Sequence, residues 1–148
     1  MSSPFDWRTV LLAKHAQHVA LIHFPIALFI AAVVLDGLAA WRKKAAYSTA
    51  AFINLSAAAI CVFPALLTGV AAWQWQLEGQ KLKGILLYHL LSALVSSSII
   101  LLSWWMQFRS RREQEIYLPS WVFPLELVGV VLIMLTGHLG GFLSGVNT

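Results

Sequence analysis

Charged residues are scarce in this chain. Asp, Glu, Lys and Arg together make up 11% of the 148 residues, whereas 59% of the residues are hydrophobic. A soluble domain typically carries about 25% charged and about 45–50% apolar residues. This composition excludes an ordinary water-soluble domain and indicates an integral membrane protein, which the length predicts to be one domain over residues 1–148.

Cysteine is nearly absent as well. The single Cys61 lies inside an apolar run, which excludes an intrachain disulfide and a cysteine-based metal motif. The formal net charge is +4, but the basic residues sit at the ends of apolar runs, where they anchor helices at lipid headgroups. We therefore expect the lipid bilayer as a partner, and no nucleic acid. The N-terminal residues also lack the pattern of a cleavable signal peptide.

Four apolar runs are long enough to cross a bilayer, which takes roughly 20 residues. They predict transmembrane helices at residues 19–41, 47–73, 84–108 and 120–143. Short connections make sequential helices antiparallel neighbours. The predicted fold class is therefore all-α, an integral membrane up-down-up-down four-helix bundle, preceded by a short interfacial helix at residues 5–18.

The distribution of Lys and Arg predicts the orientation. One side of the membrane receives six of these residues: Arg42, Lys43, Lys44, Arg109, Arg111 and Arg112. The other side receives four: Arg8, Lys14, Lys81 and Lys83. Because cytoplasmic loops carry the excess of Lys and Arg, we expect a multi-pass protein of the bacterial inner (cytoplasmic) membrane with both termini in the periplasm.

The five histidines gather on the predicted periplasmic side. His23, His89 and His138 lie about 27, 30 and 26 Å from the opposite boundary of their helices, at about 1.5 Å per residue. Three different helices thus place an imidazole near one depth. His15 and His18 fall in the expected interfacial helix, where we expect them to face water or headgroups.

Two of these imidazoles suit a haem. Helices 1 and 3 of an up-down bundle lie across a diagonal, so His23 and His89 are candidates for the two axial ligands of a haem b. Gly69, at a similar level, would let the flat macrocycle approach the backbone, and His138 would be a third imidazole beside the site. One face of helix 3 is small and polar, as bundle interiors are: His89, Ser92, Ser96, Ile99 and Ser103.

A plainer interpretation of the histidines stays open. Pro25 leaves the carbonyl of Leu21 without its usual donor, and His23 could serve it. An intramembrane histidine can also join two helices by a hydrogen bond.

Polar residues also lie near the predicted cytoplasmic side. Asp36, Asn54 and Glu126 could form a layer that accepts or passes protons. However, Asp36 points about 140° away from His23 around the helix, so the two do not share a face. For Asp36 the favoured interpretation is that it snorkels to the interface or pairs with another subunit.

Five blocks in order resemble a known family: "HFPIAL", the Asp of "VLDGLA", "LLTGVAAW", "YHLLSAL" and "GHLGGFLSGVNT". Over His18 to Val146 they resemble a bacterial group of predicted integral membrane proteins, domain-of-unknown-function family 2231. The resemblance implies a four-helix membrane domain, functional histidines at His23 and His89, and a close-packed Gly140–Gly141 end. Members often resemble partners of redox or cytochrome-type modules, which favours haem. His138 departs from the family pattern, in which a bulky or aromatic residue is more common there.

Three functions remain open. The first is a membrane b-type cytochrome, a bis-His electron carrier that works between quinol and a periplasmic redox partner. Its haem propionates would be neutralised by basic residues: Arg8, Lys14, Lys81 or Lys83. A haem with two axial histidines has no free position, which favours a carrier over a stand-alone enzyme.

The other two functions need no haem. His23, His89 and His138 could form a three-histidine Zn or Cu site. Alternatively, the chain is a cofactor-free structural subunit of a larger membrane complex or a homo-oligomer, whose histidines hold helices together.

Overall fold

Each of the four apolar runs forms one α-helix in the computed structural model, which describes residues 14–113 and 121–144. The helices are α2 (Lys14–Arg42), α3 (Ala45–Gln76), α4 (Ile85–Arg112) and α5 (Val122–Leu143). All four are long and apolar enough to cross a membrane. The predicted fold class, an all-α four-helix membrane bundle, is confirmed.

The helices extend further than the apolar runs. Helix α2 begins at Lys14 rather than at residue 19, since neither glycine nor proline interrupts the sequence between Lys14 and Pro25. His15 and His18 therefore belong to α2, so residues 14–18 of the predicted interfacial helix at 5–18 are continuous with the first membrane-crossing helix. Residues 5–13 lie outside the described residues. At the other end of the bundle, α4 continues to Arg112 and carries three basic residues in its last turn.

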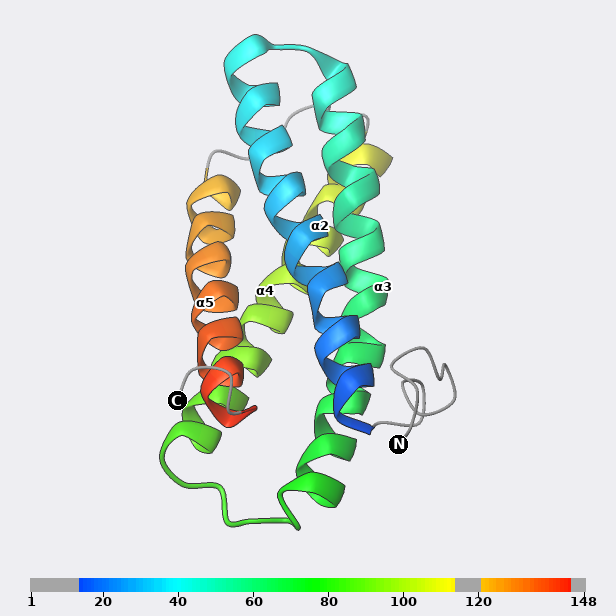
Figure 1. Cartoon of the computed structure of the whole chain (residues 1–148). Coiled ribbons are helices and arrows are strands. Elements are labelled where there is room, and N and C mark those ends of the chain that lie inside the picture. Colours follow the sequence, from blue (N-terminus) through cyan, green and yellow to red (C-terminus); the bar gives the residue numbers. More distant parts are fainter. Residues whose placement is uncertain (1–13, 114–120, 145–148) are drawn as a thin grey trace.

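The chain runs up and down through the bundle (Figure 1). Helices α2 and α3 form one closely packed pair and α4 and α5 another, while α3–α4 and α2–α5 contacts join the pairs. This order places α2 diagonally opposite α4, as predicted. One end of the bundle holds Lys14 and Leu143, and the other holds Arg42 and Val122. We call them the Lys14 end and the Arg42 end.

The buried core occupies the half of the bundle towards the Arg42 end. On α3 the last buried residue before the Lys14 end is Val62, on α4 it is Ser92, and on α5 it is Ile133. The centre of the core is apolar, with Phe29 and Leu55 fully buried. Towards the Lys14 end the described side chains are only partly buried or exposed. The helices therefore close tightly at one end and leave more open packing at the other.

Small residues let the helices approach closely within this core. Gly129 of α5 faces both Phe29 of α2 and Ile99 of α4, and a Cβ built there would lie 2.9 Å from Phe29 Cζ and 2.8 Å from Ile99 Cγ2. Three helices thus meet at one glycine. Between α2 and α3 the buried contacts include alanines: Ala32, Ala39, Ala51, Ala58 and Ala59.

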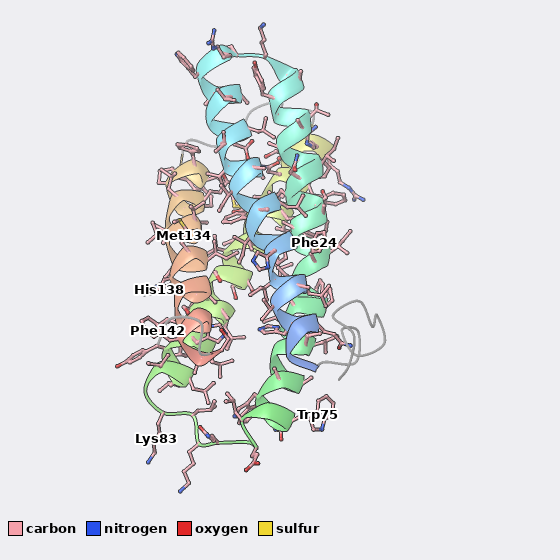
Figure 2. All side chains as sticks on the ribbon, viewed as in Figure 1. Phe24, Trp75, Lys83, Met134, His138 and Phe142 are labelled. Carbon is pink, nitrogen blue, oxygen red and sulfur yellow. The ribbon has the colours of Figure 1, made fainter. Side chains whose placement is uncertain are left out.

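The outside of the bundle is apolar. Figure 2 shows Met134, His138 and Phe142 along one side of α5, pointing away from the other helices. Met134 is 61% exposed, and large exposed hydrophobic residues occur on every helix. In a chain with four membrane-crossing helices, this surface is the one that contacts lipid.

Candidate functional site

The described histidine side chains lie at the Lys14 end, beyond the buried core. His18 and His23 are on α2, His89 is on α4 and His138 is on α5. His15 lies in the first turn of α2, and its side chain is outside the described part of the chain. The described histidines therefore lie at one end of the bundle, as the sequence predicted. At this end the helices pack less tightly.

His23 is held within its own helix. Its Nδ1 lies 2.6 Å from the carbonyl oxygen of Val19, one turn earlier, and the side chain is exposed. The ring does not serve the carbonyl of Leu21, which Pro25 leaves without its donor. Because a carbonyl oxygen only accepts, Nδ1 must carry the proton in this contact, so the neutral ring presents Nε2 as a lone pair.

His89 makes an equivalent contact to another helix. Its Nδ1 donates to the carbonyl oxygen of Thr136 on α5, at 3.0 Å. Gly140 makes room for the ring, since a Cβ there would lie 3.2 Å from His89 Cε1. The contact joins α4 to α5, as the predicted helix-joining histidine would, and again leaves Nε2 as the acceptor nitrogen. Close packing was expected at Gly140, and the group that packs against this glycine is the His89 ring.

His18 and Gly69 form a third contact, which differs from the prediction. The Thr68 hydroxyl donates to the carbonyl oxygen of Pro64 at 2.8 Å and so accepts from His18 Nδ1, 3.1 Å away. A Cβ at Gly69 would lie 3.1 Å from His18 Cε1. His18 thus packs against α3 instead of facing water or headgroups, because α2 is already helical there. Gly69 makes room for this imidazole.

His138 stands apart from the other imidazoles. It is exposed, and its ring packs edge-on against Phe142, with 5.0 Å between ring centroids (Figure 2). Among the described residues, no three His, Cys, Asp or Glu side chains come close enough together to hold a metal ion. The predicted three-histidine Zn or Cu site of His23, His89 and His138 is therefore not assembled.

His23 and His89 share one arrangement, in which ring Nδ1 lies on a backbone carbonyl oxygen. A ligating imidazole usually donates one ring N–H to a carbonyl or carboxylate, which fixes its orientation and leaves the other nitrogen for the metal. Neither Nε2 has a hydrogen bond to another described residue. The two rings lie on the diagonally placed helices α2 and α4, towards the same end of the bundle.

A second polar site lies inside the core at the Arg42 end. Asp36 of α2 is 8% exposed, and its Oδ2 accepts a hydrogen bond from Gln107 Nε2 of α4, which is 3% exposed. The favoured sequence interpretation of Asp36, snorkelling to the interface or pairing with another subunit, is wrong. The partner is on α4 of the same chain, one turn beyond the small polar face that the sequence identified.

Arg111 supplies positive charge near this aspartate. It is one turn beyond Gln107 on α4, and its Nη2 donates to the carbonyl oxygen and hydroxyl of Ser48 on α3, at 2.6 and 3.2 Å. Its guanidinium also stacks on Phe52, 4.5 Å from the ring centroid. Arg111 and Asp36 lie close enough to interact electrostatically, although the two do not form a direct ion pair.

Glu126 of α5 completes the cluster. It is fully buried, and neither carboxyl oxygen has a hydrogen-bond partner among the described residues. Asp36 and the Gln107 amide lie close enough to act on it electrostatically. Asn54, the third predicted member of this polar layer, instead donates to the carbonyl oxygen of Ala50 on its own helix, at 2.9 Å.

Sequence reasoning missed two members of the cluster. Gln107 continues the spacing of Ser96 and Ser103 along α4, and this signal could have revealed it. Arg111 is one further turn along but was counted as a headgroup anchor. No spacing rule indicates that Arg111 folds back onto Ser48 of α3.

The comparisons with known proteins give a family and no closer relative. The family model described as "Predicted membrane protein (DUF2231)" matches residues 14–146, nearly the whole chain. No curated protein and no solved structure matches the chain.

Proposed function

Since the chain belongs to the DUF2231 family of predicted membrane proteins, whose description assigns no reaction, we propose from its histidines that it is a membrane b-type cytochrome. His23 and His89 would be the axial ligands of one haem b at the Lys14 end. The observation that carries the proposal is the state of these two rings. Each has Nδ1 bound to a backbone carbonyl and Nε2 without a hydrogen bond to another described residue.

The position of the rings supports the same function. They are on α2 and α4, the two helices that face each other across the bundle. They lie beyond the buried core, where neighbouring side chains are only partly buried. A cofactor between the helix pairs at this level would displace little of the tight packing around Phe29 and Leu55.

The protein would contribute orientation and environment rather than bond-making chemistry. A haem with two imidazole ligands supplies one-electron transfer, and no open iron position is left for a substrate. The carbonyl oxygens of Val19 and Thr136 would hold the two rings in the ligating tautomer. Lys81 and Lys83 are exposed in the α3–α4 connection at the same end, and they would neutralise the propionates.

The proposed setting is the bacterial inner membrane, with the Lys14 end in the periplasm. Among the described residues, six Lys and Arg residues lie towards the Arg42 end and three at the Lys14 end, and such an excess is typical of the cytoplasmic side. The carrier would then exchange electrons with a membrane quinol and a periplasmic redox protein, alone, as a homo-oligomer or as a subunit of a larger complex.

A second candidate is a structural subunit without a cofactor. One observation favours it: the His89 and His18 contacts each join two helices, as hydrogen-bonding side chains do in membrane bundles. In this case the imidazoles contribute stability only.

The visible spectrum of the protein, purified in detergent from haem-replete bacterial cells, separates the two candidates. The cytochrome predicts a Soret band and a sharp α band on reduction. His89→Ala and His23→Ala should each lose the low-spin bands. The matched control is His138→Ala, which removes an exposed imidazole from the same end of the bundle and should leave the spectrum unchanged.

Gel filtration and circular dichroism would establish that each variant is folded. Unchanged bands in a folded His89→Ala protein would rule out this ligand pair. Wild-type protein that takes up no haem, either in cells or on titration with haemin, would favour the structural subunit and refute the cytochrome, whatever the variants do.

A further inference from the structure

The buried carboxyl groups at the Arg42 end are separate from the histidines and unexplained by electron transfer. Asp36 and Glu126 are the only acidic residues within the four membrane-crossing segments. They come from α2 and α5, which lie in different tightly packed helix pairs. Intramembrane acidic residues are costly, and those that occur usually serve a function.

The donors in the cluster are too few for two ionised carboxylates. Gln107 donates one hydrogen bond to Asp36. Arg111 donates its hydrogen bonds to Ser48 rather than to either carboxyl group. Glu126 receives no hydrogen bond from any described residue, although it is fully buried. An ionised carboxylate in such a position lacks the compensation that burial of a charge requires.

An unpartnered hydroxyl lies in the same part of the core. Ser103 Oγ is fully buried and, with the two oxygens of Glu126, makes up the buried side-chain polar atoms without a partner in the described part of the chain. Helices α4 and α5 are antiparallel, and Ile99 contacts Gly129. Ser103 follows Ile99 by one turn of α4, and Glu126 precedes Gly129 by one turn of α5. Because the two helices run in opposite directions, Ser103 and Glu126 lie at the same level. The unsatisfied atoms therefore lie at one level of the buried core.

The charge count also leaves room for one proton. The groups that act on the two carboxyls are Gln107 and Arg111 of α4, with Ser48 of α3 next to Arg111. Among these described neighbours Arg111 supplies the single positive charge. Two carboxylates and one guanidinium leave an excess negative charge in the membrane, which one bound proton removes.

We propose that Asp36 and Glu126 form a proton-binding site, in which the two carboxyl groups together hold one proton and exchange it with water at the Arg42 end. Asp36 is the outer group, with 8% of its surface exposed, and Glu126 is the inner group, with none. Binding converts one carboxylate to a carboxylic acid, which then has an O–H to donate to a neighbouring oxygen. No other atom changes its bonding. The site does not depend on the haem, and the chain would have it in either proposed function.

Infrared spectroscopy of the wild-type protein tests the site directly. A protonated carboxyl group has a C=O stretching band apart from those of carboxylates and amides. The protein at neutral pH should show one such band per chain, and raising the pH should remove it. Biosynthetic 13C labelling of glutamate or aspartate shifts the band when the labelled residue holds the proton, so the assignment needs no variant.

Variants then locate the band. Glu126→Gln keeps the shape and neutral charge of the protonated side chain and should lose a glutamate band. The matched control is Glu113→Gln, which removes an exposed carboxylate at the end of α4 and should leave the band intact. In Asp36→Asn the excess negative charge is gone, because the remaining carboxylate is balanced by Arg111, so raising the pH should remove the band sooner than in the wild type.

Three results would overturn the proposal. The first is wild-type protein without a protonated carboxyl band at neutral pH. The second is a band that neither isotope label shifts, or that a folded Glu126→Gln/Asp36→Asn double variant retains. The third is a band that disappears when Na+ replaces choline at fixed pH, because the site would then bind a metal cation in place of the proton.

Discussion

Gly129→Ala probes the point where three helices meet. The added Cβ would lie 2.8 Å from Ile99 Cγ2, 2.9 Å from Phe29 Cζ and 3.0 Å from Phe29 Cε1. Neither neighbour yields easily, since the Phe29 ring is fully buried and Ile99 is 8% exposed. Real side-chain atoms do not approach this closely, so the backbone of α5 must move away from α2 or α4.

The magnitude follows from two opposing terms. Overpacking a rigid core costs about 1–3 kcal/mol, and a site bounded by a buried ring and a β-branched methyl belongs at the upper limit. Replacing glycine by alanine in a helix returns at most about 1 kcal/mol. We expect Gly129→Ala to lower the free energy of unfolding by about 2 kcal/mol, taking both terms at those values.

Reversible unfolding in mixed detergent micelles measures this difference. The matched control is Gly137→Ala, two turns along the same helix, where the nearest atom to the new Cβ is Ile26 Cδ1 at 3.9 Å. That variant should be as stable as the wild type or more so. Ile99→Ala removes the Ile99 methyl group that would clash with the new Cβ. The Gly129→Ala/Ile99→Ala double variant should therefore lose less free energy of unfolding than the sum of the losses in the two single variants. Equal effects of Gly129→Ala and Gly137→Ala would refute the close packing at Gly129.

Two further changes test the Lys14 end. Gly84, before α4, has φ +56° and ψ −132° with open space around a Cβ, so Gly84→Ala and Gly84→Asn should each cost about 1–3 kcal/mol through backbone strain alone; denaturation curves that match the wild type would contradict this. Thr68→Val removes the acceptor of His18 Nδ1 and should cost about 1 kcal/mol, whereas Thr136→Val should leave the His89 contact intact, because His89 binds the backbone carbonyl. Nuclear magnetic resonance of the imidazole nitrogens should show a changed His18 signal in the first variant and an unchanged His89 signal in the second.

The sequence predicted the architecture because transmembrane helices are specified locally. Length, apolar composition and short connections were sufficient for four antiparallel helices and for the diagonal placement of α2 and α4. The helix ends were less accurate, since an amphipathic segment such as residues 14–18 is helical both on a membrane surface and across it. Only the contact of His18 with Thr68 distinguishes these cases.

Side-chain partners could be predicted less well. The level of His23 and His89 followed from helical rise, but the carbonyl that each ring binds depends on rotamers and on the neighbouring helix. The family resemblance implied close packing at the Gly140–Gly141 end, yet an added Cβ would meet its nearest neighbour at 3.2 Å at Gly140 and at 2.8 Å at Gly129, because the bulk of the facing residues decides the contact. The assignment of Asp36 to the interface failed because a helical wheel of α2 gives only the direction of the side chain. It does not show that Gln107 of α4 lies within hydrogen-bond distance of Asp36.

The coordination state of the iron, measured by electron paramagnetic resonance of the oxidised protein, tests the central claim most directly. Two axial imidazoles predict a low-spin six-coordinate signal in the wild type. In His23→Gly and in His89→Gly the signal should become high-spin, and added imidazole should restore the low-spin form by filling the vacated position. A low-spin signal that survives either substitution without imidazole, or a wild-type protein with no haem signal, would contradict the account.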